Sequence, residues 1–445
     1  MSPIAPRQPT VDDRLWELAR PSPPGAIPTL RRTRQLLALL GNPQQHLATV
    51  HVGGTSGKGS TCHLLTAMLQ AADYPVGMHS KPHLATVRER LVQSGVPITA
   101  EDLSALIDRV LPLLDGSEWL DGRPTWFELV VALAFDWFQS RGAQPVVVEV
   151  GLGGSWDATN VLQPLVSILT NVGLDHIEIL GTTVEAIARD KAGILKAGAT
   201  AITGATQPSV LSIIEARTRQ IGQPLWRLGH EIVVNTKIVN DQGSQFDLAL
   251  PGALFRDLEI GLLGRHQVDN AALAVAAAIA LAERGYPVAE DALRHGLATC
   301  RVPGRLERVA GTPDVLLDGA HNPEKMAALA AALRMLSPRA RPVCVVAMRR
   351  GHDIAGTLAP LLGVASTIVL TQIRASTDWG REQSIDPMIL FQTLGAVSEP
   401  AILMQPDPDA ALDQARNIAG PTGLVCVTGS LYLVGQLRGR LLAGR

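Results

Sequence analysis

Residues 51–61, HVGGTSGKGST, combine glycines, one lysine and hydroxyl side chains directly after the apolar run LATV. Glycines let backbone N–H groups approach an anion closely, and a helix that starts there adds the positive end of its dipole. Lys58 supplies a full positive charge, and the hydroxyl of Ser60 or Thr61 can face a magnesium ion. The stretch therefore predicts a phosphate-binding loop.

The spacing of this loop departs from the usual phosphate-binding pattern. Val52 stands at the first glycine position, and Gly59 separates Lys58 from Ser60. The alternative is a tight turn that binds nothing. The apolar strand pattern before the loop and the helical spacing of apolar residues in 65–72 favour nucleotide binding.

Two further polar side chains fall at the ends of predicted strands. Glu149 ends the β-branched run VVVEV, and His176 ends a second such run within TNVGLDHIEILG. The carboxyl ends of parallel strands form the ligand-binding edge of an open α/β sheet. Glu149 is either a magnesium ligand or a plain strand-end glutamate. His176 is either a ligand or a structural histidine.

Lys191 lies on the predicted helix of TTVEAIARDKAGILKAG, which opens with the capping box Thr182 and Glu185. Apolar residues recur on its side of the helix, namely Val184, Ile187, Ile194 and Leu195. An unpaired ammonium on an apolar face is costly. Lys191 therefore either extends outward to solvent or serves the phosphate site.

The elements that position these residues follow from periodicity and capping. The proline-rich start to about residue 28 predicts a loose arm, and Thr29 is expected to cap a helix that ends at Gly41. A capping box at Thr125 and Glu128 predicts another helix, and continuous apolar runs predict buried parallel strands near 145–150 and 165–172.

Residues 225–262 have short alternating runs that predict an antiparallel flap, followed by a helix over 267–285. Beyond CRVPGRLERV, strands alternate with helices and predict a second doubly wound sheet. The predicted fold is α/β: a phosphate-loop domain with a doubly wound, mostly parallel sheet over residues 1–302, and a smaller Rossmann-like α/β domain over 303–445.

Length and charge bound the function. A chain of 445 residues is too long for one ordinary domain. Lys plus Arg number 39 against 41 Asp plus Glu, so no chain-wide basic field favours nucleic acid or an anionic membrane as a partner. The start lacks the apolar core of a signal peptide, and the apolar run 271–282 is shorter than the ~20 residues of a membrane span, which predicts a soluble, cytoplasmic protein.

The cysteines lack the spacing of a zinc site or of a disulfide framework, and they are expected to be buried free thiols. They are Cys62, Cys300, Cys344 and Cys426.

Several separated stretches together resemble folylpolyglutamate synthase and dihydrofolate synthase, members of the Mur ligase superfamily. They are LLGNPQ, HVGGTSGKGST, PHLATVRERL, FELVVALAF, EVGLGGSWDATNV, GLDHIEILGTTVEAIARDKAGILK, GRHQVDNAALA, VPGRLE, DGAHNP and GSLYLVG. They occur in order from about residue 36 to residue 437. The resemblance implies an ATP-dependent amide ligase whose first domain binds ATP and whose second brings in L-glutamate, with the reaction in the cleft between them.

The resemblance also implies roles for single residues. Those at ATP would be Gly54, Thr55, Ser56, Gly57, Lys58, Gly59, Ser60 and Thr61 of the loop, with Asn270 at the adenine and Arg305, Asp318 and His321 from the hinge and second domain. Magnesium would be held by Ser80, Glu149 and His176. Lys191 would carry a carbamate, which turns an inward cation into an anion, and Asp157 would contact the substrate. Lys58, Lys191 and His176 would be catalytic.

The implied chemistry follows from charge. An acceptor carboxylate attacks the γ-phosphate of ATP, and magnesium and Lys58 offset the repulsion of the two anions. The acyl phosphate is then attacked by the α-amine of glutamate, while domain closure shields the intermediate from water.

The chain departs from the family at three places. Lys81 stands where a magnesium-binding serine is common, so either Ser80 substitutes or one metal contact is lost. Ser155 and Trp156 replace arginine and leucine beside the pterin-facing part of the site. Gly351 and His352 replace Asp-Lys, and TQIRASTDWGREQ lacks the familiar proline-containing loop.

Three hypotheses remain at this stage. The first is a ligase that adds glutamate to dihydropteroate, to reduced folates, or to both. The second is a ligase of the same mechanism that acts on another carboxylate, because the departures cluster at acceptor and glutamate positions. The third is a nucleotide-binding protein without ligase activity. A monomer is expected in each case.

Overall fold

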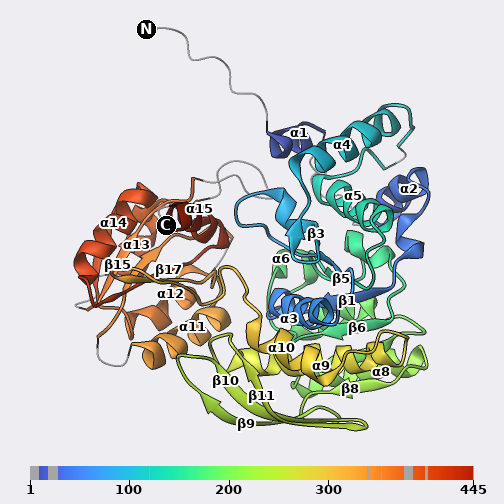
Figure 1. Cartoon of the computed structure of the whole chain (residues 1–445). Coiled ribbons are helices and arrows are strands. Elements are labelled where there is room, and N and C mark those ends of the chain that lie inside the picture. Colours follow the sequence, from blue (N-terminus) through green and yellow to red (C-terminus); the bar gives the residue numbers. More distant parts are fainter. Residues whose placement is uncertain are drawn as a thin grey trace. The chain divides into compact units, whose positions relative to one another are not determined.

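The computed structural model describes residues 10–18, 29–119, 121–337, 340–351, 353–374, 384–395 and 399–443. The chain forms two compact units, Met1–Glu231 with Leu273–Gly296, and Ile232–Ala272 with Leu297–Arg445. Each unit contains a largely parallel sheet with helices packed on it, so the predicted α/β class is confirmed (Figure 1).

The first unit is built on an eight-stranded sheet of order β4-β3-β2-β5-β1-β6-β7-β8. Its strands are β1 (Thr49–Gly53), β2 (Gly77–His79), β3 (Val92–Gln93), β4 (Val96–Pro97), β5 (Val146–Glu149), β6 (Val166–Leu169), β7 (Thr200–Thr203) and β8 (Leu225–Arg227). All neighbours from β2 to β8 pair in parallel, whereas β3 and β4 are antiparallel. Because β1 lies between β5 and β6, its carboxyl end is the point where open α/β sheets bind ligands.

Helices cover both faces of this sheet. They are α2 (Arg31–Leu39), α3 (Lys58–Ala71), α4 (Ala100–Asp115), α5 (Trp126–Ser140), α6 (Ile177–Leu180), α7 (Val184–Lys191) and α8 (Pro208–Gln220). Val146 and Val148 of β5 pack into the core that contains α5. Successive strand residues face opposite sides, so Glu149 lies on the other face, where α3 contacts β1 and β5. Short 3-10 turns, η1 (Pro43–His46), η2 (Val87–Arg90), η3 (Ala158–Val161) and η4 (Ala192–Ile194), complete this unit.

The prediction of a loose N-terminal arm is wrong for residues 10–18, which contain helix α1 (Val11–Leu18). Thr10 and Asp13 cap it reciprocally: the Thr10 N–H donates to Asp13 Oδ2 and the Asp13 N–H to Thr10 Oγ1. Leu15 is buried, and the ring of Trp16 stacks on Trp126 with centroids 5.1 Å apart. These tertiary contacts outweigh the prolines that follow. The remainder of the arm lies outside the described residues.

The second unit contains a six-stranded sheet of order β12-β13-β17-β14-β15-β16. Its strands are β12 (Glu307–Val309), β13 (Asp314–Leu317), β14 (Val343–Val346), β15 (Thr367–Leu370), β16 (Ala401–Met404) and β17 (Leu424–Thr428), and only β12 is antiparallel. Its helices form two sets, α11 (Pro323–Leu336), α12 (Ile354–Leu362) and α13 (Pro387–Leu394), and α14 (Pro408–Ala419) and α15 (Leu431–Ala443). Right-handed crossovers place these sets on opposite faces, as predicted for a doubly wound sheet.

The predicted antiparallel flap is confirmed over part of its range. Strands β9 (Val233–Val239), β10 (Ser244–Leu250) and β11 (Ala253–Ile260) form a three-stranded antiparallel sheet. Residues 225–227 instead form β8, which pairs in parallel with β7. Helices α9 (His266–Ala282) and α10 (Glu290–Thr299) follow the flap, as expected for the first of them.

One of the three predicted helix caps is confirmed and two are wrong. Thr125 and Glu128 form the predicted capping box of α5. The cap of α7 is Thr183 rather than Thr182, because Thr183 accepts from the Ala186 N–H. The predicted Thr29 cap is also wrong, because the residue before α2 is Leu30 and the Thr29 hydroxyl accepts from the Arg31 N–H. Helix α2 ends at Leu39 rather than at Gly41.

All the cysteines are buried free thiols, as predicted. Within the described ranges, no helix combines the length and the apolar composition needed to cross a membrane.

We expect Leu15→Ala to lower the free energy of unfolding of the first unit by about 2–4 kcal/mol, because Leu15 is only 1% exposed and its removal leaves a cavity. Urea unfolding followed by tryptophan fluorescence measures the change, since Trp16 and Trp126 lie in this unit. Leu39→Ala is the matched control, because Leu39 is 39% exposed. Equal effects of the two variants would contradict the docking of α1.

Candidate functional site

The glycine loop connects β1 to α3 at the switch point of the first sheet. Gly54 and Gly57 have φ values of 137° and 82°, which favour glycine. A Cβ on Gly54 would also collide with Thr170 Oγ1 at the end of β6. The loop therefore requires glycine at both positions, which a ligand-free turn shares with a phosphate loop.

The segment after β6 holds the loop in place. The Thr55 N–H donates to the carbonyl of Asn171, and the Ser56 N–H donates to Asn171 Oδ1 at 2.7 Å. Thr55 Oγ1 accepts from the Gly173 N–H. These hydrogen bonds fix the backbone of Thr55 and Ser56 against the segment after β6, and electrostatic catalysis depends on backbone groups that are fixed in this way.

The first turn of α3 keeps its anion-binding groups available. The first N–H groups of a helix have no intrahelical acceptor. Gly57, the residue before α3, has no side chain that could accept from them. The hydroxyls of Ser56 and Thr61 are buried and have no hydrogen-bond partner among the described residues. Buried polar atoms without a partner are rare, and here they point to a ligand at the loop.

Two lysines converge on one backbone oxygen of the loop. Lys58 Nζ donates to the Gly54 carbonyl at 3.0 Å, and Lys191 Nζ donates to the same oxygen at 3.1 Å. Lys191 is 3% exposed, so the prediction of an inward lysine is confirmed and the outward alternative is wrong. Burial, reinforced by the charge of Lys58, lowers the pKa of Lys191 to about 7.

Glu149 reaches the same loop from the end of β5. A Cβ on Gly59 would lie 3.4 Å from Glu149 Oε2, which places the buried carboxylate against the first turn of α3. Its Oε2 also accepts from the Lys81 N–H at 3.1 Å. Ser80 immediately precedes Lys81 after β2. The end of β2 and the end of β5 therefore meet at the phosphate loop.

His176 does not end a strand, contrary to the prediction. Strand β6 ends at Leu169, and His176 stands before the short helix α6 with φ 50° and its side chain partly exposed. Burial lowers its pKa to about 4, against the charge of Asp175. The charges of Lys58, Lys81 and Lys191 lower it further, so the imidazole is neutral and able to donate a lone pair.

The residues at the loop fit a magnesium ion held jointly with phosphate oxygens. Magnesium is usually bound by one or two carboxylates together with substrate phosphates and water. The buried Glu149 carboxylate and the Thr61 hydroxyl, which has no partner in the ranges that the structure describes, are oxygen ligands of the kind that such a site would need. In the described part of the chain, no three His, Cys, Asp or Glu side chains gather into a metal site of their own.

Asp157 is buried on the loop after β5 and accepts hydrogen bonds from its own turn. Its Oδ1 accepts from the Thr159 N–H and hydroxyl, and its Oδ2 accepts from the Leu152 N–H. A Cβ on Gly151 would collide with the ring of Phe127 and lie 2.7 Å from Asp157 Oδ2. Phe127 was not among the predicted site residues, because within FELVVALAF it reads as one more apolar residue of a helix.

The same loop packs directly on the helix that carries Lys191. A Cβ on Gly154 would lie 2.7 Å from Lys191 Cα, and Ser155 donates from both its N–H and its hydroxyl to the Asp190 carbonyl. Ser155 also fills the space beside Gly193. Ser155, which stands where the family has arginine, thus packs closely against the helix of Lys191. The neighbouring Trp156 is 58% exposed.

In the second unit, Asp318 ends β13 beside β17. Its carboxylate accepts from the Leu306 and Ala320 N–H groups, and burial raises its pKa although Arg305 and His266 act in the opposite direction. The structure thus places Arg305 close enough to Asp318 to act on its charge. His266 also lies near this carboxylate, and burial lowers the pKa of its imidazole. The sequence analysis did not single out His266, which occurs there only as part of the stretch GRHQVDNAALA.

The remaining predicted residues of the second unit lie on helix starts. His321 Nδ1 is 2.7 Å from the Gly319 carbonyl, and its Nε2 is 3.1 Å from Lys325 Nζ. Asn270 lies in α9, and its amide donates to Gln267 Oε1. Gly351 has φ 84°, whereas His352 and residues 375–383 of the altered loop lie outside the described residues.

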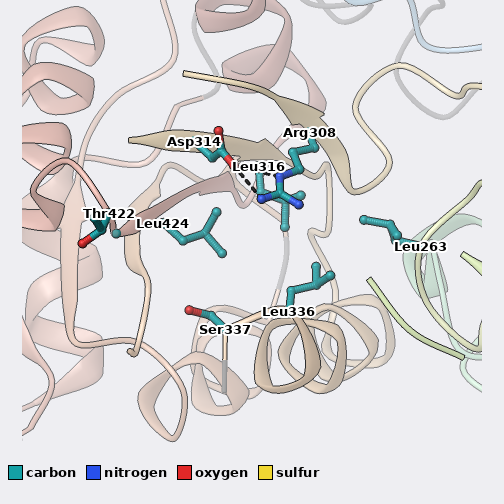
Figure 2. Close-up of a pocket in the computed structure, with 9 residues that line it drawn as sticks. Leu263, Arg308, Asp314, Leu316, Leu336, Ser337, Thr422 and Leu424 are labelled. Carbon is teal, nitrogen blue, oxygen red and sulfur yellow. Dashed lines mark hydrogen bonds and ion pairs between the residues drawn. The ribbon is translucent and has the colours of Figure 1, made fainter. Parts of the chain in front are cut away.

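A pocket of about 140 Å³ lies elsewhere in the second unit (Figure 2). Its walls include Leu316, Leu336 and Leu424, with the ion pair of Arg308 and Asp314 at one side. Asp314 and Leu424 begin β13 and β17, so this pocket is at the end of the sheet opposite Asp318. It contains none of the predicted site residues.

A phosphate loop at the switch point of one doubly wound unit, joined to a second unit of Rossmann type, defines an ATP-dependent ligase of Mur ligase architecture. Residues 113–278 match the family described as "Mur ligase middle domain", and residues 306–441 match "Dihydrofolate synthetase, C-terminal domain". The two matches cover parts of both units.

Whole-chain comparisons agree with these matches. The chain is 35% identical over 422 residues to the dihydrofolate synthase/folylpolyglutamate synthase of Bacillus subtilis (strain 168), covering 94% of this chain and 96% of the relative. The Mycobacterium tuberculosis folylpolyglutamate synthase complexed with ADP has a TM-score of 0.87 at 30% identity, with 97% of each chain covered. Escherichia coli FolC in complex with DHPP and ADP has a TM-score of 0.83 at 29% identity, with 97% and 96% covered. The chain belongs to the folylpolyglutamate synthase/dihydrofolate synthase family.

We expect Lys191→Met to change the pH dependence of stability. The unfolded lysine titrates near 10.5 and the folded one near 7, so the wild type gains stability as pH rises between these values, at up to about 1.4 kcal/mol per pH unit. The variant lacks this gain. Its free energy of unfolding therefore exceeds that of the wild type most below pH 7, and the difference shrinks toward pH 10. Urea unfolding in buffer free of carbon dioxide measures the difference.

Lys237→Met is the control for this series. The carboxylates of Asp247 and Asp257 raise the pKa of Lys237, so its difference from wild type stays constant from pH 6 to pH 9. A Lys191→Met difference that is equally flat would contradict the lowered pKa.

Proposed function

We propose that this ligase joins L-glutamate to the carboxylate of dihydropteroate, of reduced folates, or of both, using ATP. The observation that carries the proposal is the meeting of Lys58 and Lys191 on the Gly54 carbonyl, with Glu149 at the same loop. We further propose that residues 1–302 form the ATP-binding domain and residues 303–445 the glutamate domain.

The loop would bind the phosphates of ATP through the N–H groups at the start of α3 and through Lys58. An acceptor carboxylate oxygen attacks the γ-phosphorus, and the bond to the bridging oxygen breaks so that ADP leaves. Lys58 offsets the repulsion between the two anions and orients the phosphate for in-line attack. The glutamate amine then attacks the acyl carbon, loses a proton, and phosphate departs.

Magnesium would be held by Glu149 and the Thr61 hydroxyl together with phosphate oxygens, and by His176 as the resemblance implies. Ser80 would substitute for the serine that Lys81 replaces, or else that one metal contact is lost. When bound, magnesium supplies positive charge at the transferred phosphate. The neutral His176 imidazole is compatible with this role.

A carbamate on Lys191 is proposed in addition. Only a neutral amine adds to carbon dioxide, forming a nitrogen–carbon bond and releasing one proton, and a pKa of about 7 provides that amine near neutral pH. The resulting anion would remove the repulsion that Lys58 now exerts on Lys191 and would face the metal.

The acceptor would lie beside Asp157 and Phe127. Phe127 offers an aromatic surface next to Asp157 Oδ2, which suits a planar heterocycle with N–H groups. Arg305, Asp318 and His321 would complete the ATP site from the hinge and second domain, with Asn270 at the adenine. The proposed reaction needs neither nucleic acid nor a membrane as a partner. That the protein is a cytoplasmic monomer stays a prediction.

A different carboxylate acceptor is the second candidate, because exposed Trp156 stands on the loop that holds Asp157, where the family has leucine. This candidate keeps the same chemistry with a changed acceptor surface.

With ATP, magnesium and glutamate, we expect the purified protein to release phosphate and form an amide only when a pterin carboxylate is supplied. A panel of carboxylic acids, followed by mass spectrometry of the products, separates the candidates. Amide formation with another acid alone would favour the second candidate. Tight ATP binding without any amide product would instead indicate a protein that has lost ligation.

We expect Lys58→Ala to lower kcat/KM for ATP by about 10²–10³-fold, because it removes charge stabilisation of the transferred phosphate. Glu149→Gln should abolish turnover while the fold, monitored by circular dichroism, is retained. Glu101→Gln on the exposed face of α4 is the matched control and should behave as wild type. Activity of Glu149→Gln near the wild-type level would refute the metal assignment.

A further inference from the structure

A chain of buried polar groups runs from β1 to Asp157 on the loop after β5. His51 Nε2 lies 2.8 Å from Thr159 Oγ1, and the Thr159 hydroxyl donates to Asp157 Oδ1 at 2.5 Å. His51 and Thr159 are fully buried and Asp157 nearly so. Three side chains from two separate segments thus form one continuous hydrogen-bonded chain.

His51 is an unusual residue for its place in the sheet. It lies in the middle of the central strand β1, between Val50 and Val52, and its register partners are Val148 and Ser167. Val148 belongs to the apolar core under α5, so His51 faces that core. Its Nδ1 is buried, and no described residue gives it a hydrogen-bond partner. An apolar residue would avoid that unsatisfied atom, so packing alone does not account for a histidine here.

The direction of each hydrogen bond follows from the proton count. The Thr159 hydroxyl has one proton and directs it to Asp157, so its oxygen accepts from His51 Nε2–H. Burial lowers the pKa of His51 to about 3, which keeps the imidazole neutral in the Nε2–H form. The chain therefore donates in one direction, from His51 through Thr159 to Asp157.

The two carboxylate oxygens of Asp157 therefore differ in how many hydrogen bonds they accept. Oδ1 accepts from both the N–H and the hydroxyl of Thr159, which uses its two lone pairs. Oδ2 accepts only from the Leu152 N–H among the described groups and retains one acceptor position. This is also the oxygen beside Gly151, next to the ring of Phe127.

We propose that His51 and Thr159 are positioning residues that fix the Asp157 carboxylate so that Oδ2 receives an N–H donor of the acceptor substrate. The ligand class is a planar heterocycle that presents an N–H edge. This inference rests on the proposed function, because it takes Asp157 to contact the acceptor. Neither His51 nor Thr159 touches substrate, and both act through Asp157.

The test compares substitutions that break the chain with substitutions that restore it. His51→Leu and Thr159→Val remove one link each at similar volume, and we expect each to raise the KM for the pterin acceptor about tenfold, the effect of losing one well-oriented hydrogen bond. The kcat and the KM for ATP should stay within about twofold. His51→Gln retains a donor at the position of Nε2, and Thr159→Ser retains the hydroxyl, so both should recover most of the wild-type KM.

The double variant His51→Leu/Thr159→Val distinguishes a chain from two separate effects. If both residues act through Asp157, the double variant should resemble either single variant rather than multiply their effects. Thr203→Val is the structural control, because Thr203 Oγ1 makes buried hydrogen bonds in β7, which β1 and β6 separate from β5 in the sheet. It should lower stability without a selective change in the acceptor KM.

Three results would overturn the proposal: an unchanged acceptor KM, multiplied effects in the double variant, or equal losses in all kinetic parameters that track stability as in Thr203→Val. Nitrogen-15 NMR gives a readout that does not depend on the substrate. Comparison with His51→Gln assigns the His51 signals, and we expect a neutral ring protonated at Nε2. Protonation at Nδ1 contradicts the chain. If the wild type uses no pterin acid, the proposed function fails, and this spectrum alone decides whether the chain exists.

Discussion

Two amino groups donating to a single carbonyl oxygen are the constraint on which the rest of the site depends. Lys58 and Lys191 come from helices far apart in sequence, and both reach Gly54 inside a buried environment. Burial lowers the pKa of Lys191, and repulsion by the like charge of Lys58 lowers it further. Negative charge would favour the charged form of both lysines, whether it comes from phosphate at the loop or from a carbamate on Lys191.

The fold supplies the means to hold that arrangement. Because β1 lies between β5 and β6, the loop after β1 is flanked by Glu149 on one side and by Thr170 and Asn171 on the other. Glycine at position 54 is required by the backbone and by the close approach of Thr170. The loop after β5 packs on the helix of Lys191 and also carries Asp157, which couples the acceptor side to the phosphate side through rigid contacts.

Local signals in the sequence were sufficient for the parts of this site that depend on periodicity. The loop, the strand that ends at Glu149 and the inward position of Lys191 follow from strand and helix patterns, and the structure has all three. Helix α1, the parallel pairing of β8 and the loop position of His176 were predicted incorrectly, because each depends on tertiary contacts that no local pattern encodes. Phe127 and His266 were missed for the same reason, since their neighbours come from distant segments.

The central claim is that the acceptor carboxylate is itself phosphorylated at the glycine loop. Turnover of an acceptor labelled with oxygen-18 in its carboxylate tests this most directly. The account predicts that the inorganic phosphate released carries one oxygen-18 atom for each amide formed, because that oxygen bridges carbon and phosphorus in the intermediate. Amide formation with unlabelled phosphate would contradict it.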